Sequence, residues 1–136
     1  MASAASGRAA GARVRPRVLV VDDDDSMRRA LVRTLELAEF EVEAFRYAEA
    51  VLARGIVERD ICLVLDVDAP GIEGIDLARS LCATDRKIAT IFITAFGPSE
   101  ISAQLTGLSP LAVLCKPFSK EELLDAVGRA CREDSR

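Results

Sequence analysis

Residues 61–71 read ICLVLDVDAPG, in which five apolar residues run without a break into Asp66 and a second aspartate follows at Asp68. A strand that is apolar at every position is typical of a parallel sheet, where helices cover both faces. A carboxylate that directly continues such a strand needs a partner, because an unpaired buried charge is costly. This stretch therefore predicts a central strand of a parallel sheet, with a candidate functional carboxylate at its end.

Strand-like and helical patterns alternate on both sides of this stretch. The strand-like runs are 17–21, 41–45, 61–65, 88–93 and 111–115, and the helical runs are 26–38, 48–55, 74–82, 99–105 and a last one that begins at Ser119. Parallel strands need crossover connections, and these are almost always right-handed. Strict alternation of five strands with five helices therefore predicts an α/β domain of three layers, with the parallel sheet between two layers of helices.

The helical runs also predict caps and buried faces. Ser119 and Glu122 have the spacing of a capping box, which favours a helix start at Ser119. The residues expected on the buried faces are Met27, Leu31, Leu35 and Ala38 in the first helix and Leu123, Val127 and Ala130 in the last.

The composition excludes several kinds of protein. The 136 residues, half of them hydrophobic, suffice for one domain with a core, and no apolar run approaches the roughly 20 residues that cross a bilayer. The chain has no histidine and its four cysteines lie far apart, which excludes histidine-dependent nucleophilic catalysis and the usual zinc sites. We therefore expect buried, reduced thiols in a cytoplasmic protein that does not contact a membrane.

Charge divides the chain into parts. Residues 1–16 are rich in Ala, Gly, Ser and Arg and are predicted to form a flexible basic arm, with an organelle transit peptide as the alternative. Beyond the four arginines of the first 17 residues, the chain carries 14 basic and 22 acidic residues, a net charge of −8. Direct nucleic-acid binding is not expected of so acidic a domain. The predicted domain spans 17–132, and 133–136 form a short C-terminal tail.

The candidate site lies where the strands end, because ligands of open α/β sheets bind beyond the carboxyl ends of the strands. A run of four aspartates alone is typical of a solvated helix N-terminus. Here, however, acids, a hydroxyl and a lysine follow four different strands, so we predict that they form one site. The residues that follow these strands are Asp22, Asp23, Asp24, Asp25, Asp66, Thr94 and Lys116, with Pro117 after the lysine, and the predicted site consists of Asp22, Asp23, Asp66, Thr94 and Lys116.

These residue types point to phosphoryl chemistry. Two carboxylates about 4 Å apart repel by roughly 4 kcal/mol at an effective dielectric constant near 20, so Asp22, Asp23 and Asp66 together need a cation. Oxygen ligands with open positions favour Mg²⁺. Lys116 and Thr94 suit contacts to phosphoryl oxygens. The predicted reaction is in-line phosphoryl transfer onto Asp66.

Four segments resemble the signature motifs of response-regulator receiver domains of two-component signalling: VLVVDDDDSMRRAL, LVLDVDAPGIEG, IFITAF and LCKPF. The resemblance covers about residues 17–132 and implies a flavodoxin-like (βα)5 fold with strand order 2-1-3-4-5, as in stand-alone chemotaxis regulators. It implies that Asp66 accepts a phosphoryl group from the phosphohistidine of a sensor histidine kinase or phosphotransfer protein. The chain would then be a signalling domain with only self-directed phosphotransfer and autodephosphorylation, not an enzyme.

The same resemblance implies a role for each site residue. Asp22, Asp23, Asp66 and the backbone carbonyl of Asp68 would bind Mg²⁺, with the Asp68 side chain beside the phosphoryl group, where it could tighten Mg²⁺ binding or hinder an attacking water. Thr94 would be the switch hydroxyl that moves toward the phosphoryl group, and Lys116 would be the cationic contact of that group. The peptide bond that precedes Pro117 would be cis. Phosphorylation would reshape the face formed by the fourth helix, fifth strand and fifth helix, where a downstream effector docks or a homodimer forms.

The departures from the family pattern concentrate near that output face. Val113 stands where the family usually has Tyr or Phe, so switching cannot use rotation of an aromatic ring. Ala69 replaces a usual methionine, and the pairs Gly97-Pro98 and Ser109-Pro110 alter two connections. We therefore expect phosphorylation with an output route that differs from the usual one.

Three alternatives remain open. One is a receiver-fold binding module that works without phosphorylation, and another is the receiver part of a longer DNA-binding regulator. The third is a phosphatase of the haloacid dehalogenase type, in which Asp66 would be the nucleophile and Asp68 the general acid. The position of Asp66 after the third strand rather than the first disfavours the phosphatase.

Overall fold

The computed structural model describes residues 16–56, 61–68, 73–82, 88–97, 105, 107–108 and 110–134. Within these residues a parallel five-stranded sheet has the order β2-β1-β3-β4-β5. This confirms the predicted parallel sheet and its strand order. The strands are β1 (Arg17–Val21), β2 (Glu41–Phe45), β3 (Ile61–Asp66), β4 (Ala89–Thr94) and β5 (Ala112–Cys115).

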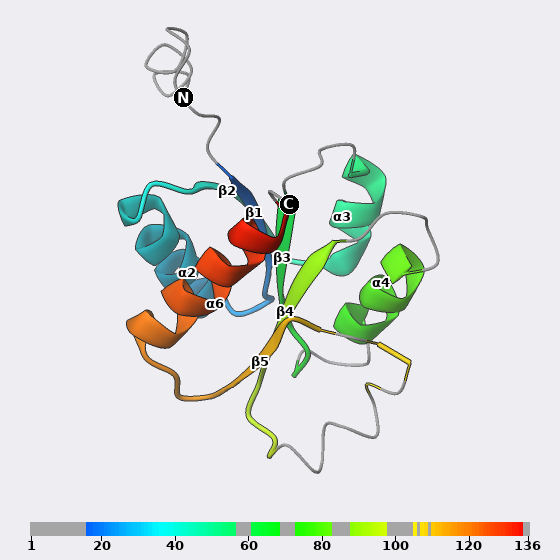
Figure 1. Ribbon diagram of the computed structural model, residues 1–136. Helices are drawn as coiled ribbons and strands as arrows, with labels where there is room; N and C mark the ends of the chain where they lie inside the picture. The colour runs from blue at the N-terminus through cyan, green and yellow to red at the C-terminus, as the bar shows by residue number, and fades with distance from the viewer. Residues whose placement is uncertain are drawn as a thin grey trace, which may run out of the picture.

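Helices cover both faces of the sheet, as Figure 1 shows, with α2 and α6 on one face and α3 and α4 on the other. Alternate residues of each strand face opposite sides, so the sheet separates two cores. Val18 and Val20 of β1 belong to the core under α2 and α6, whereas Leu19 and Val21 belong to the core under α3 and α4. The described helices are α2 (Asp25–Leu37), α3 (Ala48–Arg54), α4 (Glu73–Cys82) and α6 (Lys120–Asp134).

Local chemistry sets the helix ends. The Asp24 side chain accepts hydrogen bonds from the backbone N–H groups of Ser26 and Met27, so it caps α2. The capping box of α6 is confirmed: the Ser119 amide donates to Glu122 Oε1 at 2.8 Å, and the Glu122 amide donates to Ser119 Oγ at 3.0 Å. Gly55 ends α3 with a φ of 76°, a conformation that favours glycine.

Two expectations about burial are wrong. Ala38 is exposed because α2 ends at Leu37 and Ala38 is its C-cap. Cys115 is exposed because it ends β5, which is an edge strand, whereas Cys62 is buried in β3. The other predicted core residues of α2 and α6 pack in the core as expected: Met27, Leu31, Leu35, Leu123, Val127 and Ala130.

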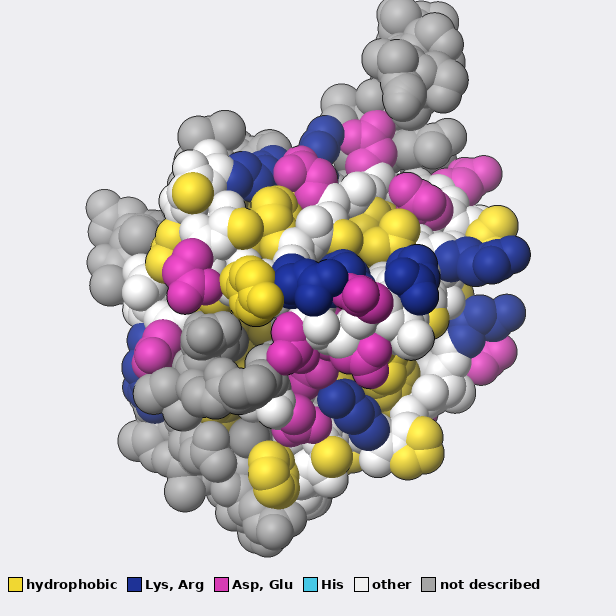
Figure 2. Space-filling view, turned by 180° about the vertical axis from the view of Figure 1, so that it is seen from behind, with side chains coloured by type: hydrophobic (Ala, Val, Ile, Leu, Met, Phe, Trp, Pro, Cys, Tyr) yellow, Lys and Arg dark blue, Asp and Glu magenta, His cyan; other side chains and the backbone are white. Residues whose placement is uncertain are grey.

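Some predictions lie outside the described residues: the arm over 1–15, nearly all of the helix expected at 99–105, and the side chains of Ala69, Pro98 and Ser109. Among the residues that can be placed, no helix is long and apolar enough to cross a membrane. Seen from behind, acidic and basic side chains are interspersed over the described surface, with hydrophobic side chains between them (Figure 2).

Candidate functional site

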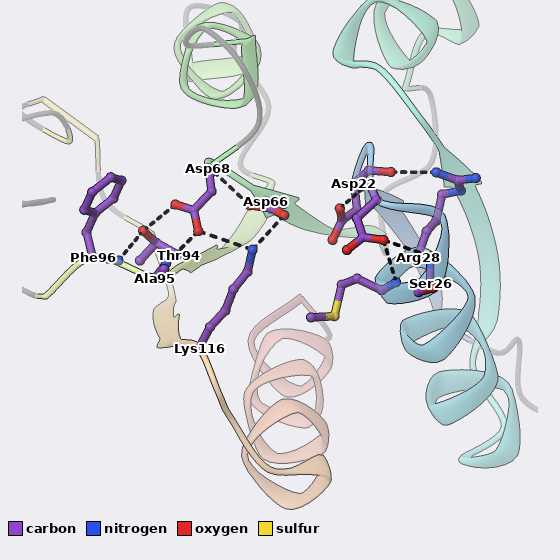
Figure 3. A network of polar contacts seen from close by, with 11 residues as sticks. Asp22, Ser26, Arg28, Asp66, Asp68, Thr94, Ala95, Phe96 and Lys116 are labelled. Carbon is purple, nitrogen blue, oxygen red and sulfur yellow. Dashed lines mark hydrogen bonds and ion pairs between the residues drawn. The ribbon is translucent and has the colours of Figure 1, made fainter.

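The carboxyl ends of four strands bring the predicted site residues to one edge of the sheet. Register pairs Val21 with Leu65, Asp66 with Ile93 and Thr94 with Cys115, so β1, β3, β4 and β5 end side by side. The residues at or just beyond these ends are Asp22, Asp66, Thr94 and Lys116, drawn together in Figure 3. The structure therefore brings these four predicted site residues to the same end of the sheet.

Three carboxylates form the first part of the site. Oxygen atoms of Asp22, Asp23 and Asp66 lie within 4.8 Å of one another. Asp22 is 1% exposed and Asp66 is 5% exposed, so two of the three groups are buried. Burial raises the pKa of Asp22 to about 7; the Asp24 N–H opposes this rise, and the neighbouring Asp66 carboxylate adds to it. The cluster therefore carries unfavourable charge that a cation would relieve.

One atom of this cluster lacks a hydrogen bond. Asp22 Oδ1 accepts from the backbone N–H of Asp24 at 2.9 Å, whereas the buried Oδ2 has no partner among the residues that the structure describes. A buried carboxylate oxygen without a donor is costly, and a hard divalent cation satisfies it. The donor set therefore fits Mg²⁺, with Asp22, Asp23 and Asp66 as the side chains that would hold it.

Lys116 connects the acid cluster to the other half of the site. Its Nζ lies 3.0 Å from Asp66 Oδ2 and 3.2 Å from Asp68 Oδ2. Burial opposes the charged form, but the hydrogen bonds and charges of Asp66 and then Asp68 outweigh it and raise the pKa of Lys116. The ammonium is therefore held in its charged form between two carboxylates.

Asp68 is more central than its sequence position indicates. Its Oδ1 accepts a hydrogen bond from Thr94 Oγ1 at 2.8 Å, and its Oδ2 accepts one from the Ala95 amide at 2.7 Å (Figure 3). The Asp68 amide in turn donates to Asp66 Oδ1 at 2.8 Å. The structure thus joins Thr94 and Lys116 through the Asp68 side chain. Sequence analysis missed these contacts, although a second acid two residues beyond Asp66 was a visible signal.

The four consecutive aspartates have different surroundings. Asp22 and Asp23 belong to the acid cluster, Asp24 caps α2, and Asp25 forms ion pairs with Arg28 and Arg46. The Arg28 side chain also donates to the backbone carbonyl of Asp22 at 2.8 Å. Sequence analysis did not single out Arg28, whose only signal is its spacing of three residues from Asp25 on the same helix.

The remaining predicted residues lie on β5 and directly after it. Val113 is half-buried and packs against the core under α3 and α4. The Lys116 amide donates to the Thr94 carbonyl at 2.7 Å, which joins the ends of β4 and β5. The peptide bond between Lys116 and Pro117 is cis, as the resemblance implied.

Comparison with known proteins agrees with this geometry. The family model of the response regulator receiver domain matches residues 18–128. Nodulation protein W of Bradyrhizobium diazoefficiens is 38% identical over 117 residues, which are 86% of this chain and 52% of that protein. The response regulator receiver protein CpdR of Brucella abortus is 32% identical over 111 residues, which are 82% of this chain and 92% of that protein.

A solved structure supports the same assignment. The response regulator StyR superposes with a TM-score of 0.80 and 38% identity, and the match covers 90% of this chain and 62% of that chain. This chain spans only 25–52% of the length of several curated relatives, which include transcriptional regulatory proteins. The matching family model, the strand order and the converging acidic, hydroxyl and lysine side chains agree, and the chain belongs to the response-regulator receiver domain family of two-component signal transduction.

Proposed function

We propose that Asp66 accepts a phosphoryl group from the phosphohistidine of a sensor histidine kinase or a phosphotransfer protein. The observation that carries this proposal is the place of the Asp66 carboxylate, buried at the end of β3 between two further acids and the Lys116 ammonium 3.0 Å away. A carboxylate oxygen attacks phosphorus and forms the new oxygen–phosphorus bond. The nitrogen–phosphorus bond breaks, and its electron pair remains on the imidazole nitrogen.

The proposed cofactor is Mg²⁺, held by Asp22, Asp23, Asp66 and the backbone carbonyl of Asp68. The unpartnered Oδ2 of Asp22 and the short distances among the three carboxylates support this choice. When bound, the ion would supply positive charge to the carboxylates and to the phosphoryl oxygens.

Thr94 and Lys116 are proposed to bind the phosphoryl oxygens and to report their presence. Both lie at strand ends on the acceptor side of the sheet, and the Lys116 amide donates to the Thr94 carbonyl at 2.7 Å. We propose that this hydrogen bond carries a change at Thr94 to the end of β5. The output face would consist of the expected helix at 99–105, β5 and the fifth helix, α6, where a downstream effector binds or a homodimer forms.

A second candidate function is a receiver-fold binding module that works without phosphorylation. Val113 favours it, because this half-buried residue provides no aromatic ring to rotate toward Thr94. A third possibility is control of a DNA-binding part, since several longer relatives are named transcriptional regulatory proteins. We further propose a cytoplasmic location, a basic arm over 1–16, a receiver domain over 17–132 and a short tail over 133–136.

Acetyl phosphate tests the acceptor directly. We expect wild type incubated with acetyl phosphate and Mg²⁺ to gain the mass of one phosphoryl group, which base removes, whereas Asp66→Asn gains none. Asp125→Asn is the matched control, because it removes the same charge from an exposed position on α6. Intact mass spectrometry makes the measurement. Unlabelled wild type, or label that persists in Asp66→Asn, would contradict acceptance at Asp66.

A further inference from the structure

Three hydrogen-bond donors converge on the carboxylate of Asp68. Thr94 Oγ1 and the Ala95 amide approach its two oxygens at 2.8 and 2.7 Å, and Lys116 Nζ lies 3.2 Å from Oδ2. The donors come from the ends of β4 and β5, whereas the carboxylate comes from the end of β3 (Figure 3). A hydroxyl, an amide and an ammonium arranged in this way form an anion-binding site.

This anion-binding site lies directly beside the proposed acceptor, Asp66. Lys116 Nζ contacts Asp66 Oδ2 at 3.0 Å and Asp68 Oδ2 at 3.2 Å, so a single ammonium reaches both carboxylates. A phosphoryl group bonded to Asp66 would present its oxygens to the same three donors. The Thr94 hydroxyl and the Ala95 amide have one proton each, so they cannot bond fully to both anions.

We infer that the Asp68 carboxylate occupies the binding site of the phosphoryl group and must leave before that group can bind. The inference rests on the proposed function of Asp66. In the unphosphorylated chain Asp68 satisfies Thr94, Ala95 and Lys116 and adds negative charge beside the acceptor. Both effects oppose the arrival of a second anion. Asp68 is thus a positioning residue that sets how readily the site accepts a phosphoryl group.

Beryllofluoride, a non-reactive analogue of the phosphoryl group, tests the competition. In saturating Mg²⁺, we expect Asp68→Asn and Asp68→Ala to bind beryllofluoride about tenfold more tightly than wild type, or about 1.4 kcal/mol. Asp125→Asn should bind it like wild type. Because the chain has no tryptophan, fluorine NMR or calorimetry is the suitable measurement. Circular dichroism of each variant establishes that it is folded.

A second measurement requires neither Mg²⁺ nor beryllofluoride. Amide hydrogen exchange at Ala95 should accelerate in Asp68→Ala and stay unchanged in Asp125→Asn, because only Asp68→Ala removes the acceptor of the Ala95 amide. Equal or weaker beryllofluoride binding by folded Asp68 variants would overturn the competition alone. Failure of wild type and variants alike to bind beryllofluoride or to label Asp66 would overturn the proposed function together with it.

Discussion

Asp22 combines near-complete burial with an oxygen that has no donor among the described residues. Its acidic neighbours have other partners, because Asp24 caps a helix and Asp25 binds two arginines. The four aspartates differ in burial because β1 ends at Val21. Asp22 is therefore still buried, whereas the residues that follow it lie closer to the surface. At the residue scale, Asp22 is therefore a buried carboxylate that a bound cation would stabilise.

Replacing this residue tests the ion site. Without Mg²⁺, Asp22→Asn should raise the free energy of unfolding by about 1–3 kcal/mol, because it removes a charge beside Asp66 and an unsatisfied buried acceptor. The same variant should lose the stabilisation that Mg²⁺ gives to wild type. Thermal unfolding in EDTA and in Mg²⁺ measures both effects, with Asp125→Asn as the control. Wild type that is not stabilised by Mg²⁺ would exclude the proposed ion site.

At the scale of elements, the ends of β1, β3, β4 and β5 carry the site residues, and the start of α6 fixes the chain that follows Lys116. Helix α6 starts from the reciprocal hydrogen bonds of Ser119 and Glu122, three residues after Lys116. The loop from Lys116 to Ser119 is therefore held at both ends, by β5 and by this cap. The buried face of α6, which includes Leu123 and Val127, anchors the helix on the sheet.

Removing the N-terminal cap of α6 should lower the stability of the protein. Ser119→Ala should lower the free energy of unfolding by about 1 kcal/mol, because the Glu122 amide loses its acceptor. Chemical denaturation measures this change. Glu121→Ala, at an exposed neighbouring position, is the control and should change stability far less. A Ser119→Ala protein as stable as this control would show that the capping box contributes nothing.

At the scale of the whole molecule, side chains from distant segments join β1 and β2 to helix α3. Glu43 of β2 accepts from Arg17 of β1 at 2.6 Å and from Arg54 of α3 at 2.8 Å. The Arg54 hydrogen bond holds the pKa of Glu43 below its ordinary 4.5, burial opposes this shift, and Arg17 adds to it. A lowered pKa means that the network stabilises the fold above about pH 4.5 and ceases to do so as the pH falls below it.

This pH dependence can be measured. At pH 7, Glu43→Gln should lower the free energy of unfolding by about 0.5–1 kcal/mol, a small effect because the group is partly exposed and screened by solvent. The difference from wild type should vanish as Glu43 becomes protonated in acid. Urea denaturation across this pH range is the measurement, and Glu49→Gln on the exposed face of α3 is the control. A difference that persists in acid would assign the effect to packing instead of charge.

Much of the fold was predictable because it depends on local patterns. The strand bounds predicted at 17–21 and 41–45 agree with the structure. The strand predicted at 61–65 is one residue longer in the structure, because β3 includes Asp66. Alternation of strands and helices, together with the family resemblance, was enough to place the acids, Thr94 and Lys116 at one edge of the sheet. The errors at Ala38 and Cys115 arose at element ends, where periodicity no longer determines burial.

Sequence alone determined the order of strands and helices, the parallel sheet and the candidate acceptor, because hydrophobic periodicity and motif spacing are properties of neighbouring residues. Only the tertiary structure decided which groups the second aspartate, Asp68, contacts. Asp68 and Thr94 are 26 residues apart, and their hydrogen bond exists because β3 and β4 are paired in register. Contacts among side chains from different strands depend on that register and on side-chain direction, and no local pattern contains either.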